Sequence, residues 1–348
     1  MGGAGEDCPS TERSEGEFRS PTERISRRLT GFEALHAESS PRVCDPCLFL
    51  LSSSLPLRTT SALPPRMNIV PFQSLACPLD GAPLQRSGAA WRCPSGHSFD
   101  IAREGHTHLL PVQNKRSRDP GDSKEMVAAR RRFLNAGCYQ PIATAVARTV
   151  LQHLPTAGGA CLDAGCGEGY YLRQLADAAA AAGEGRLALL GLDISKWAVL
   201  AAAKPFREAG WVVGSNANLP VLPATLDCVL CMFGFPVYPE FARVLKPGGL
   251  LLQVDAGPDH LRELREIIYP TLKPERSADE APPTGFDRVS SENLRFPLRL
   301  SDQAQIADLL VMTPHLYRAT AEGRARAAAL TALDVTVDVR LVGLVRRS

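Results

Sequence analysis

The stretch ACLDAGCGEGYYL, residues 160–172, constrains the fold of this chain more than any other segment. A short apolar run leads into a glycine-rich turn, and an alanine- and leucine-rich run follows. Because glycine allows positive φ angles and lets backbone N–H groups approach a ligand closely, the pattern predicts a strand, a ligand-binding turn and a helix. The candidate ligand-binding glycines are Gly165, Gly167 and Gly169.

From about residue 140 onward, short apolar runs alternate with alanine-rich segments, which is typical of a doubly wound α/β sheet. The predicted strands are 160–165, 187–193, 226–233 and 249–256, and the predicted helices between them are 171–182, 195–206 and 238–245. We expect a long polar loop at 269–293. A strand at 294–300, a helix from Ser301 and an alternating, antiparallel closing strand at 334–345 complete the predicted domain.

A lone glycine pattern of this kind also occurs at NAD sites, but three features favour S-adenosylmethionine. The segment lacks the full G-x-G-x-x-G spacing expected at a dinucleotide pyrophosphate. Asp163 lies two residues before the first glycine, where a carboxylate can meet the ammonium group of the methionine part, directly or through water. The turn LKPGG, residues 245–249, is common before the fifth strand of methyltransferases.

Further cofactor contacts are expected at the carboxyl ends of the neighbouring strands, where ligands of this fold bind. Asp193 ends the second predicted strand and is placed to accept hydrogen bonds from ribose hydroxyls. Its alternative role is to cap the helix that follows. The segment 214–220 lies where such folds contact adenine, which makes Asn216 and Ala217 candidates.

The composition is that of a soluble globular protein: 45% of the 348 residues are hydrophobic and 22% are charged. The formal net charge of +2 is nearly neutral, so a nucleic-acid surface must come from local clustering. The ten cysteines mostly lie in apolar or glycine-rich stretches, which indicates reduced thiols. No uninterrupted apolar run reaches the roughly 20 residues that span a bilayer. We therefore predict a cytoplasmic protein without membrane contact.

Residues 1–66 are rich in Ser, Pro, Arg and Glu and lack sustained periodicity, so we predict a disordered extension. Met67 precedes the first strongly patterned segment, and a start assigned too far upstream explains the extension equally well. The isolated pair Cys44 and Cys47 is interpreted as accidental.

The segment CPLDGAPLQRSGAAWRCPSGH, residues 77–97, has the spacing of a metal-binding ribbon. An aspartate stands where a second cysteine would complete C-x2-C, and carboxylates are legitimate zinc ligands. The candidate ligands are Cys77, Asp80, Cys93 and His97. The alternative is a module that lost its metal and is held by packing around Leu79, Trp91 and Phe99.

A basic connector, residues 111–134, follows this module and carries seven Lys or Arg against three acids. Within it, 124–137 is predicted to be helical, with Ser123 as the cap and Gly137 as the stop. The candidate RNA-binding residues are Lys115, Arg116, Arg118, Arg130, Arg131 and Arg132. The alternative for such a charge run is a solvated helix face.

Residues 97–141, together with LDAGCGEGYY, resemble the bacterial 23S rRNA guanine-N1 methyltransferases, which include relatives that confer macrolide resistance. The resemblance runs from about Ala76 to the C-terminus, and its most specific block is LLPVQNKRSRDPGDSKEM. It implies a zinc-ribbon-like RNA-binding module at 67–110, a basic helical connector at 111–145 and a Rossmann-like class I S-adenosylmethionine-dependent methyltransferase domain at 146–348.

The resemblance also implies site residues. The family's metal ligands fall on the four candidates given above, although cysteine is usual at Asp80. Its cofactor contacts fall on Tyr139, Gly167, Glu168 and His260. The alternatives are interdomain packing for Tyr139 and capping of the helix that begins near Asp259 for His260.

The implied activity is methyl transfer from S-adenosylmethionine to N1 of a guanosine in a hairpin loop of 23S rRNA. Asp255 and Glu240 are candidates for a base, with helix-facing or solvated carboxylates as the alternative. The aromatic residues Phe233, Phe235 and Tyr238 are candidates for stacking on an unstacked base.

Other functions are a methyltransferase acting on tRNA or a small molecule, or a non-catalytic RNA-binding assembly factor. The complete set of glycines and aspartates argues against the non-catalytic alternative. A homodimer is compatible with the sequence, although no residue points to it.

Overall fold

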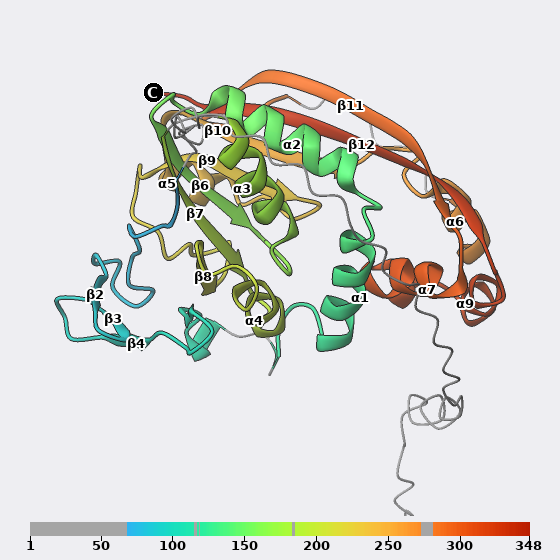
Figure 1. Cartoon of the computed structure of the whole chain (residues 1–348), viewed down its shortest axis with the longest axis horizontal. Coiled ribbons are helices and arrows are strands. Elements are labelled where there is room, and N and C mark those ends of the chain that lie inside the picture. Colours follow the sequence, from blue (N-terminus) through green and yellow to red (C-terminus); the bar gives the residue numbers. More distant parts are fainter. Residues whose placement is uncertain (1–67, 115–116, 118, 183–184, 273–280) are drawn as a thin grey trace, which may run out of the picture. The chain divides into compact units, whose positions relative to one another are not determined.

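The computed structural model describes residues 68–114, 117, 119–182, 185–272 and 281–348 (Figure 1). Our predictions for the extension 1–66, the start at Met67 and the pair Cys44 and Cys47 lie outside the described residues, as do Lys115, Arg116 and Arg118. No helix in the described ranges is long and apolar enough to cross a membrane.

Nine strands of the described chain form one sheet in the order β11-β12-β10-β9-β6-β7-β8-β5, and β1 pairs with β7 outside this row. The parallel centre consists of β6 (Gly158–Ala164), β7 (Arg186–Asp193), β8 (Gly210–Val213), β9 (Leu226–Met232) and β10 (Leu245–Ala256). Two long antiparallel strands close one edge, β11 (Phe286–Leu300) and β12 (Leu333–Arg346) (Figure 1). The predicted α/β class and the antiparallel closing strand are confirmed.

Helices and the ribbon cover the two faces of the sheet. The helices are α1 (Lys124–Asn135), α2 (Gln140–His153), α3 (Tyr170–Ala182), α4 (Lys196–Ala203), α5 (Tyr238–Val244), α6 (Arg262–Ile268), α7 (Gln303–Met312), α8 (His315–Arg318) and α9 (Ala321–Ala328). Successive strand residues point to opposite faces, so Cys161 belongs to the core with α2 and α3. Its neighbour Leu162 belongs to the core with Phe241 of α5 and Trp91 of the ribbon.

The ribbon contributes a small sheet of its own and two strands to the large one. The small sheet contains β2 (Gln85–Ser87), β3 (Ala90–Arg92) and β4 (Ser98–Asp100). Before it, β1 (Asn68–Pro71) pairs in parallel with β7, and after it, β5 (His106–His108) pairs in parallel with β8. The segment predicted as a separate module therefore begins and ends in strands of the methyltransferase sheet.

The local predictions succeed at the helix of the connector and fail in the polar stretch that precedes residue 294. Ser123 caps α1, its Oγ accepting a hydrogen bond from the Met126 amide at 3.2 Å, and Gly137 has φ of +81° beyond the helix end. The loop predicted at 269–293 is wrong from residue 286 onward, because this polar stretch pairs with β12 as the first half of β11. The helix α2 and the short strand β8 were not predicted.

Candidate active site and metal centre

The glycine-rich turn between β6 and α3 is held by the end of β7. The amides of Gly165 and Cys166 donate to the Leu192 carbonyl at 2.8 and 2.9 Å. The Gly167 amide donates to Asp193 Oδ2 at 2.9 Å, and Asp193 Oδ1 accepts from the Ser195 amide at 2.8 Å. Asp193 therefore fixes the turn and also lines the large cavity that opens beside it. The cap of α4 itself is Ser195, whose Oγ accepts from the Ala198 amide.

Asp163 provides the test of whether a cationic cofactor fits this turn. Its side chain is fully buried at the carboxyl end of β6, and neither carboxylate oxygen has a hydrogen-bond partner in the described chain. Burial, reinforced by the charge of Asp193, raises the pKa of Asp163 to about 8. A buried carboxylate without a partner costs free energy unless a cation or donor meets it. The ammonium group of S-adenosylmethionine is such a cation, so the residues present fit the cofactor.

Most of the other predicted cofactor contacts line the cavity. The cavity is lined by Tyr139, Gly165, Gly167, Glu168, Asp193, Asn216, Ala217 and His260. The Asn216 amide donates to the Ala164 carbonyl at 3.2 Å, while its Oδ1 is buried without a partner in the described chain. This second unpartnered acceptor belongs to the segment 214–220, which is predicted to contact adenine.

Two of the predicted cofactor contacts, Glu168 and Gly169, have structural roles in this chain. Glu168 is buried and accepts two hydrogen bonds from the Arg173 guanidinium, at 2.8 and 2.9 Å. Gly169 has φ of +81°, and a Cβ there would lie 2.6 Å from the Trp211 ring, so packing between the turn and β8 requires glycine. Gly169 is not one of the described residues that line the cavity.

Tyr139 and His260 form a buried pair on the cavity wall. Tyr139 Oη lies 3.3 Å from His260 Nε2, and His260 Nδ1 accepts from the Asp338 amide at 3.3 Å. Burial lowers the pKa of His260 to about 4, so the ring is neutral near pH 7 and its proton lies on Nε2, which donates to Tyr139. The capping alternative for His260 is wrong, because α6 begins at Arg262 and its cap position is Leu261.

The far part of the cavity contains residues that the sequence reasoning missed. Besides the predicted Phe233, Phe235, Tyr238 and Asp255, the lining includes Gln253, Arg288, Asn293, Arg295 and Arg340. Most come from the exposed strand β11 and its partner β12, and the signal that could have found them is the run of polar and charged residues in β11. Glu240 accepts from the Leu219 amide and pairs with Arg243, and it is not among the described residues that line the cavity.

Phe233 adopts an unusual backbone conformation at the cavity. Its φ is 53°, in the left-handed region that non-glycine residues rarely occupy. Its ring lies 6.1 Å from the Tyr139 ring and 5.8 Å from the His260 ring, and 39% of the residue is exposed. Such strain persists only where surrounding contacts enforce it, and it clusters at ligand sites. Phe235 nearby is 89% exposed.

The described arginines of the connector are partly engaged within the protein. Arg130 pairs with Asp122 and donates to the Met312 carbonyl at 2.8 Å, and Arg132 pairs with Asp308. The positive charges of Arg130 and Arg131 also act on Glu168. Of these arginines, Arg130 lines the cavity. RNA contact by this helix stays a prediction, and its charges also serve the packing of α1 against α7.

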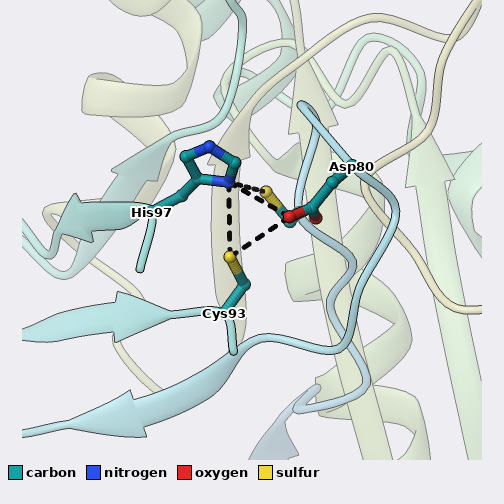
Figure 2. A group of neighbouring side chains, drawn as sticks. Asp80, Cys93 and His97 are labelled. Atoms are coloured by element: carbon teal, nitrogen blue, oxygen red, sulfur yellow. Dashed lines mark hydrogen bonds and ion pairs between the residues drawn. The ribbon is translucent and has the colours of Figure 1, made fainter. Parts of the chain in front are cut away.

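Four candidate metal ligands converge in the ribbon. The atoms offered by Cys77, Asp80, Cys93 and His97 all lie within 4.8 Å of one another. His97 Nδ1 lies 3.4 Å from Cys77 Sγ, 3.3 Å from Cys93 Sγ and 3.2 Å from Asp80 Oδ2, as Figure 2 shows for the labelled residues. Zinc bonds of about 2.0–2.3 Å in a tetrahedron put neighbouring ligand atoms about 3.3–3.8 Å apart. The donor set therefore fits zinc in chemistry and in spacing.

Two similar turns bring these ligands together. Each begins with Cys-Pro and contains a glycine of positive φ, Gly81 at +74° and Gly96 at +87°, whose amide donates back to the carbonyl of Cys77 or Cys93. The Ala82 amide fixes Asp80 by donating to its Oδ1 at 3.0 Å. In the metal-free alternative Leu79 would pack in the core, but this residue is 53% exposed.

Known proteins match both parts of this chain. Residues 75–118 match the zinc ribbon family described as "RlmA, N-terminal", and residues 161–249 match the family described as "Methyltransferase domain". A protein of Micromonospora griseorubida that bears the name of a 23S rRNA (guanine-N(1)-)-methyltransferase is 36% identical over 77% of this chain and 95% of its own length. The 23S rRNA (guanine(748)-N(1))-methyltransferase of Streptomyces fradiae is 34% identical over 75% of this chain and 91% of its own length. Among solved structures, the YcgJ protein of Bacillus subtilis aligns with a TM-score of 0.36 at 16% identity over 59% of this chain and 98% of that one.

A strand–turn–helix unit with an unpartnered carboxylate, joined to a four-ligand ribbon, defines the class of zinc-containing S-adenosylmethionine-dependent methyltransferases. Relatives that are 34–36% identical, with matches over three quarters of this chain and more than nine tenths of their own length, then specify the family. The chain belongs to the 23S rRNA (guanine-N1)-methyltransferases.

The pKa of Asp163 leads to a prediction about cofactor binding. Ionised Asp163 is the form that attracts the cofactor's ammonium group, whereas the ligand-free protein holds the carboxyl protonated below about pH 8. The affinity for S-adenosylmethionine is therefore expected to fall by up to about tenfold per pH unit between pH 8 and pH 6, with proton release on binding. Calorimetry in buffers of different ionisation enthalpy measures both quantities.

The matched control is Asp163→Asn, which keeps the shape of the side chain and cannot ionise. Its affinity is expected to be weaker at pH 8 and flat between pH 6 and pH 8. A wild-type affinity that does not change over this range would contradict the assignment of Asp163.

Proposed function

We propose that this protein transfers the methyl group of S-adenosylmethionine to N1 of a guanosine in a hairpin loop of 23S rRNA. The observation that carries the proposal is one cavity of about 2500 Å³ that joins the glycine-rich turn to the wall formed by β11 and β12. Sites for small molecules enclose about 300–1000 Å³. The excess volume and the exposed Phe235 at the cavity suit a nucleotide that remains part of a larger molecule.

The residues of this chain supply binding, orientation and exclusion of water. When bound, S-adenosylmethionine supplies an electrophilic methyl group on a sulfonium, so alignment of the acceptor atom provides most of the catalysis. Asp163, Asp193 and Asn216 are proposed to hold the cofactor at the ends of β6, β7 and β8. Phe233, with its ring facing Tyr139 and His260, is proposed to receive the unstacked base.

The size of the cavity and the charge of its wall also distinguish this function from the alternatives, a small-molecule methyltransferase and a non-catalytic assembly factor. A small-molecule substrate would leave most of the cavity filled with water, which disfavours that alternative. The arginines on the outer wall, Arg288 and Arg295, are suited to phosphate groups. A non-catalytic assembly factor has no need of the unpartnered Asp163, which costs stability. An rRNA substrate also places the enzyme in the cytoplasm. Dimer formation stays a prediction that sedimentation can check.

The test is transfer of tritiated methyl groups to ribosomal RNA from a strain that lacks the gene. We expect label in 23S rRNA and, on mapping by primer extension, a stop at one guanosine, because a methyl group on N1 blocks Watson–Crick pairing. Transfer RNA from the same strain is the control substrate. Absence of label from ribosomal RNA would rule the proposal out, and label in the tRNA control alone would support the tRNA alternative.

A further inference from the structure

A polar row crosses three strands at the far wall of the cavity. Asp255 of β10 lies opposite Arg340 of β12, and Arg340 lies opposite Asn293 of β11. Residues directly opposite each other in an antiparallel pair project from the same face. All three side chains line the cavity that also contains the glycine-rich turn. The row therefore presents an acceptor, a cation and an amide side by side to whatever occupies the cavity.

Asp255 is the carboxylate of this row. It is half-buried near the end of β10, and no hydrogen bond to its carboxylate occurs within the described part of the chain. Burial raises the pKa of Asp255, and the charge of Arg340 opposes this rise. The Cys231 thiol of β9 is the other titratable group that its charge affects. Asp255, the carboxylate of the row, therefore makes no hydrogen bond to the described residues that a ligand would have to replace.

The backbone places this row beside the aromatic residues of the cavity. Val254 precedes Asp255 and pairs with Met232, and its carbonyl accepts from the Phe233 amide at 2.8 Å. Phe233 and Asp255 therefore leave adjacent strand ends, Phe233 in the left-handed conformation described above. A base that stacks on Phe233 would present its edge to the strand end that carries Asp255.

The donors and acceptors of the row complement guanine. The Watson–Crick edge of guanine carries two donors, N1–H and the N2 amino group, beside the acceptor O6. A carboxylate accepts from the donors and an arginine donates to O6. Adenine has an unprotonated N1 and a donor in place of O6, so it mismatches both side chains. Removal of the N1 proton shifts negative charge onto O6, where a neighbouring guanidinium stabilises it.

We propose that Asp255, Arg340 and Asn293 form the binding site for the target guanine and that Asp255 is the catalytic residue that accepts its N1 proton. This inference rests on the proposed function. The N1–H bond breaks with its electrons staying on N1, and the proton passes to the Asp255 carboxylate. N1 then bonds to the methyl carbon while the carbon–sulfur bond breaks and its electrons return to sulfur. Arg340 holds O6 throughout.

Single-turnover methyl transfer to 23S rRNA tests this role with Asp255→Asn. Loss of a general base is expected to lower the rate about 100-fold or more, while the RNA dissociation constant changes by less than about threefold. The wild-type rate should fall at low pH as Asp255 gains a proton, and this limb should vanish in Asp255→Asn. Arg340→Gln removes a nearby positive charge, so the limb should move to higher pH.

The control is Asp334→Asn, at the other end of β12, where the carboxylate pairs with exposed Arg299 and does not line the cavity. Its rate should match the wild type. Asp255→Glu retains a carboxylate, so it should keep the low-pH limb even if Asp255→Asn proves unstable. A wild-type enzyme that methylates guanine N1, with Asp255→Asn equally fast or Asp255→Glu without the limb, overturns this inference alone. A wild type that does not methylate guanine N1 overturns the proposed function and this role with it.

Discussion

Replacing Cys93 by alanine is expected to remove the zinc ion, about one per chain, and to unfold the ribbon from Cys77 to His97. Structural zinc sites contribute roughly 10–16 kcal/mol in small peptides, far more than the short strands β2, β3 and β4 supply by pairing. Cys93 Sγ lies 3.5 Å from Asp80 Oδ2 and 3.3 Å from His97 Nδ1, and these last two atoms lie 3.2 Å apart. Loss of the Cys93 thiolate therefore opens the site. Elemental analysis measures the zinc, and hydrogen exchange of the ribbon amides measures the unfolding.

The control is Cys228→Ala, a fully buried cysteine in β9 that lies outside the four-ligand cluster. It should lower stability through a small cavity but leave the zinc content at one per chain. Asp80→Cys should retain zinc against chelators for longer than the wild type, because thiolate binds zinc more strongly than carboxylate. A wild-type protein that is folded and contains no zinc would refute the metal assignment.

Replacing Asp193 by alanine is expected to weaken S-adenosylmethionine binding by about 100-fold or more. The change leaves the amides of Gly167 and Ser195 without their acceptor, and each unsatisfied buried N–H group costs about 1–3 kcal/mol. The glycine-rich turn then loses the bond that fixes it, and the ribose loses the carboxylate proposed to bind it. Since 1.4 kcal/mol corresponds to a tenfold change in affinity, calorimetric titration resolves the effect easily.

A second carboxylate provides a matched control for Asp193. Asp227 lies near the amino end of the parallel strand β9, where it accepts from the Ala160 amide at 2.9 Å and pairs with Lys246. Asp227→Ala should lower the melting temperature without changing cofactor affinity, because Asp227 does not line the cavity. Equal loss of affinity in both variants would show that Asp193 acts only through the stability of the sheet.

The apolar strands and the glycine-rich turn could be predicted from the sequence because their physical causes are local. β6, β7 and β9 follow runs of buried side chains, and their observed bounds differ by one or two residues from the predicted ones. The first half of β11 could not be found in this way. Its residues 287–293 are mostly polar and are exposed on both faces of the strand, and some of them line the cavity, so a strand and a loop have the same composition there.

Contacts made far along the chain explain the remaining differences. Arg130 donates to the carbonyl of Met312, 182 residues away, a partner that no spacing reveals, and its contact with phosphate stays a prediction. The wall residues Arg340 and Asn293 share a row with Asp255 only because β12 lies between β10 and β11. Gly169 illustrates the opposite case, since the motif is correct and the reason for the glycine is packing against Trp211.

The pairing of β1 with β7 and of β5 with β8 determines how this protein can be divided. The ribbon is an insertion between two strands of the catalytic sheet and is not appended to it. A fragment that starts at residue 111 would leave β8 as a bare edge and the first half of β7 unpaired on that side, and such edges promote aggregation. Exchange of ribbons between relatives therefore requires two junctions, one after β1 and one before β5, so that the recipient sheet keeps both of its outer strands.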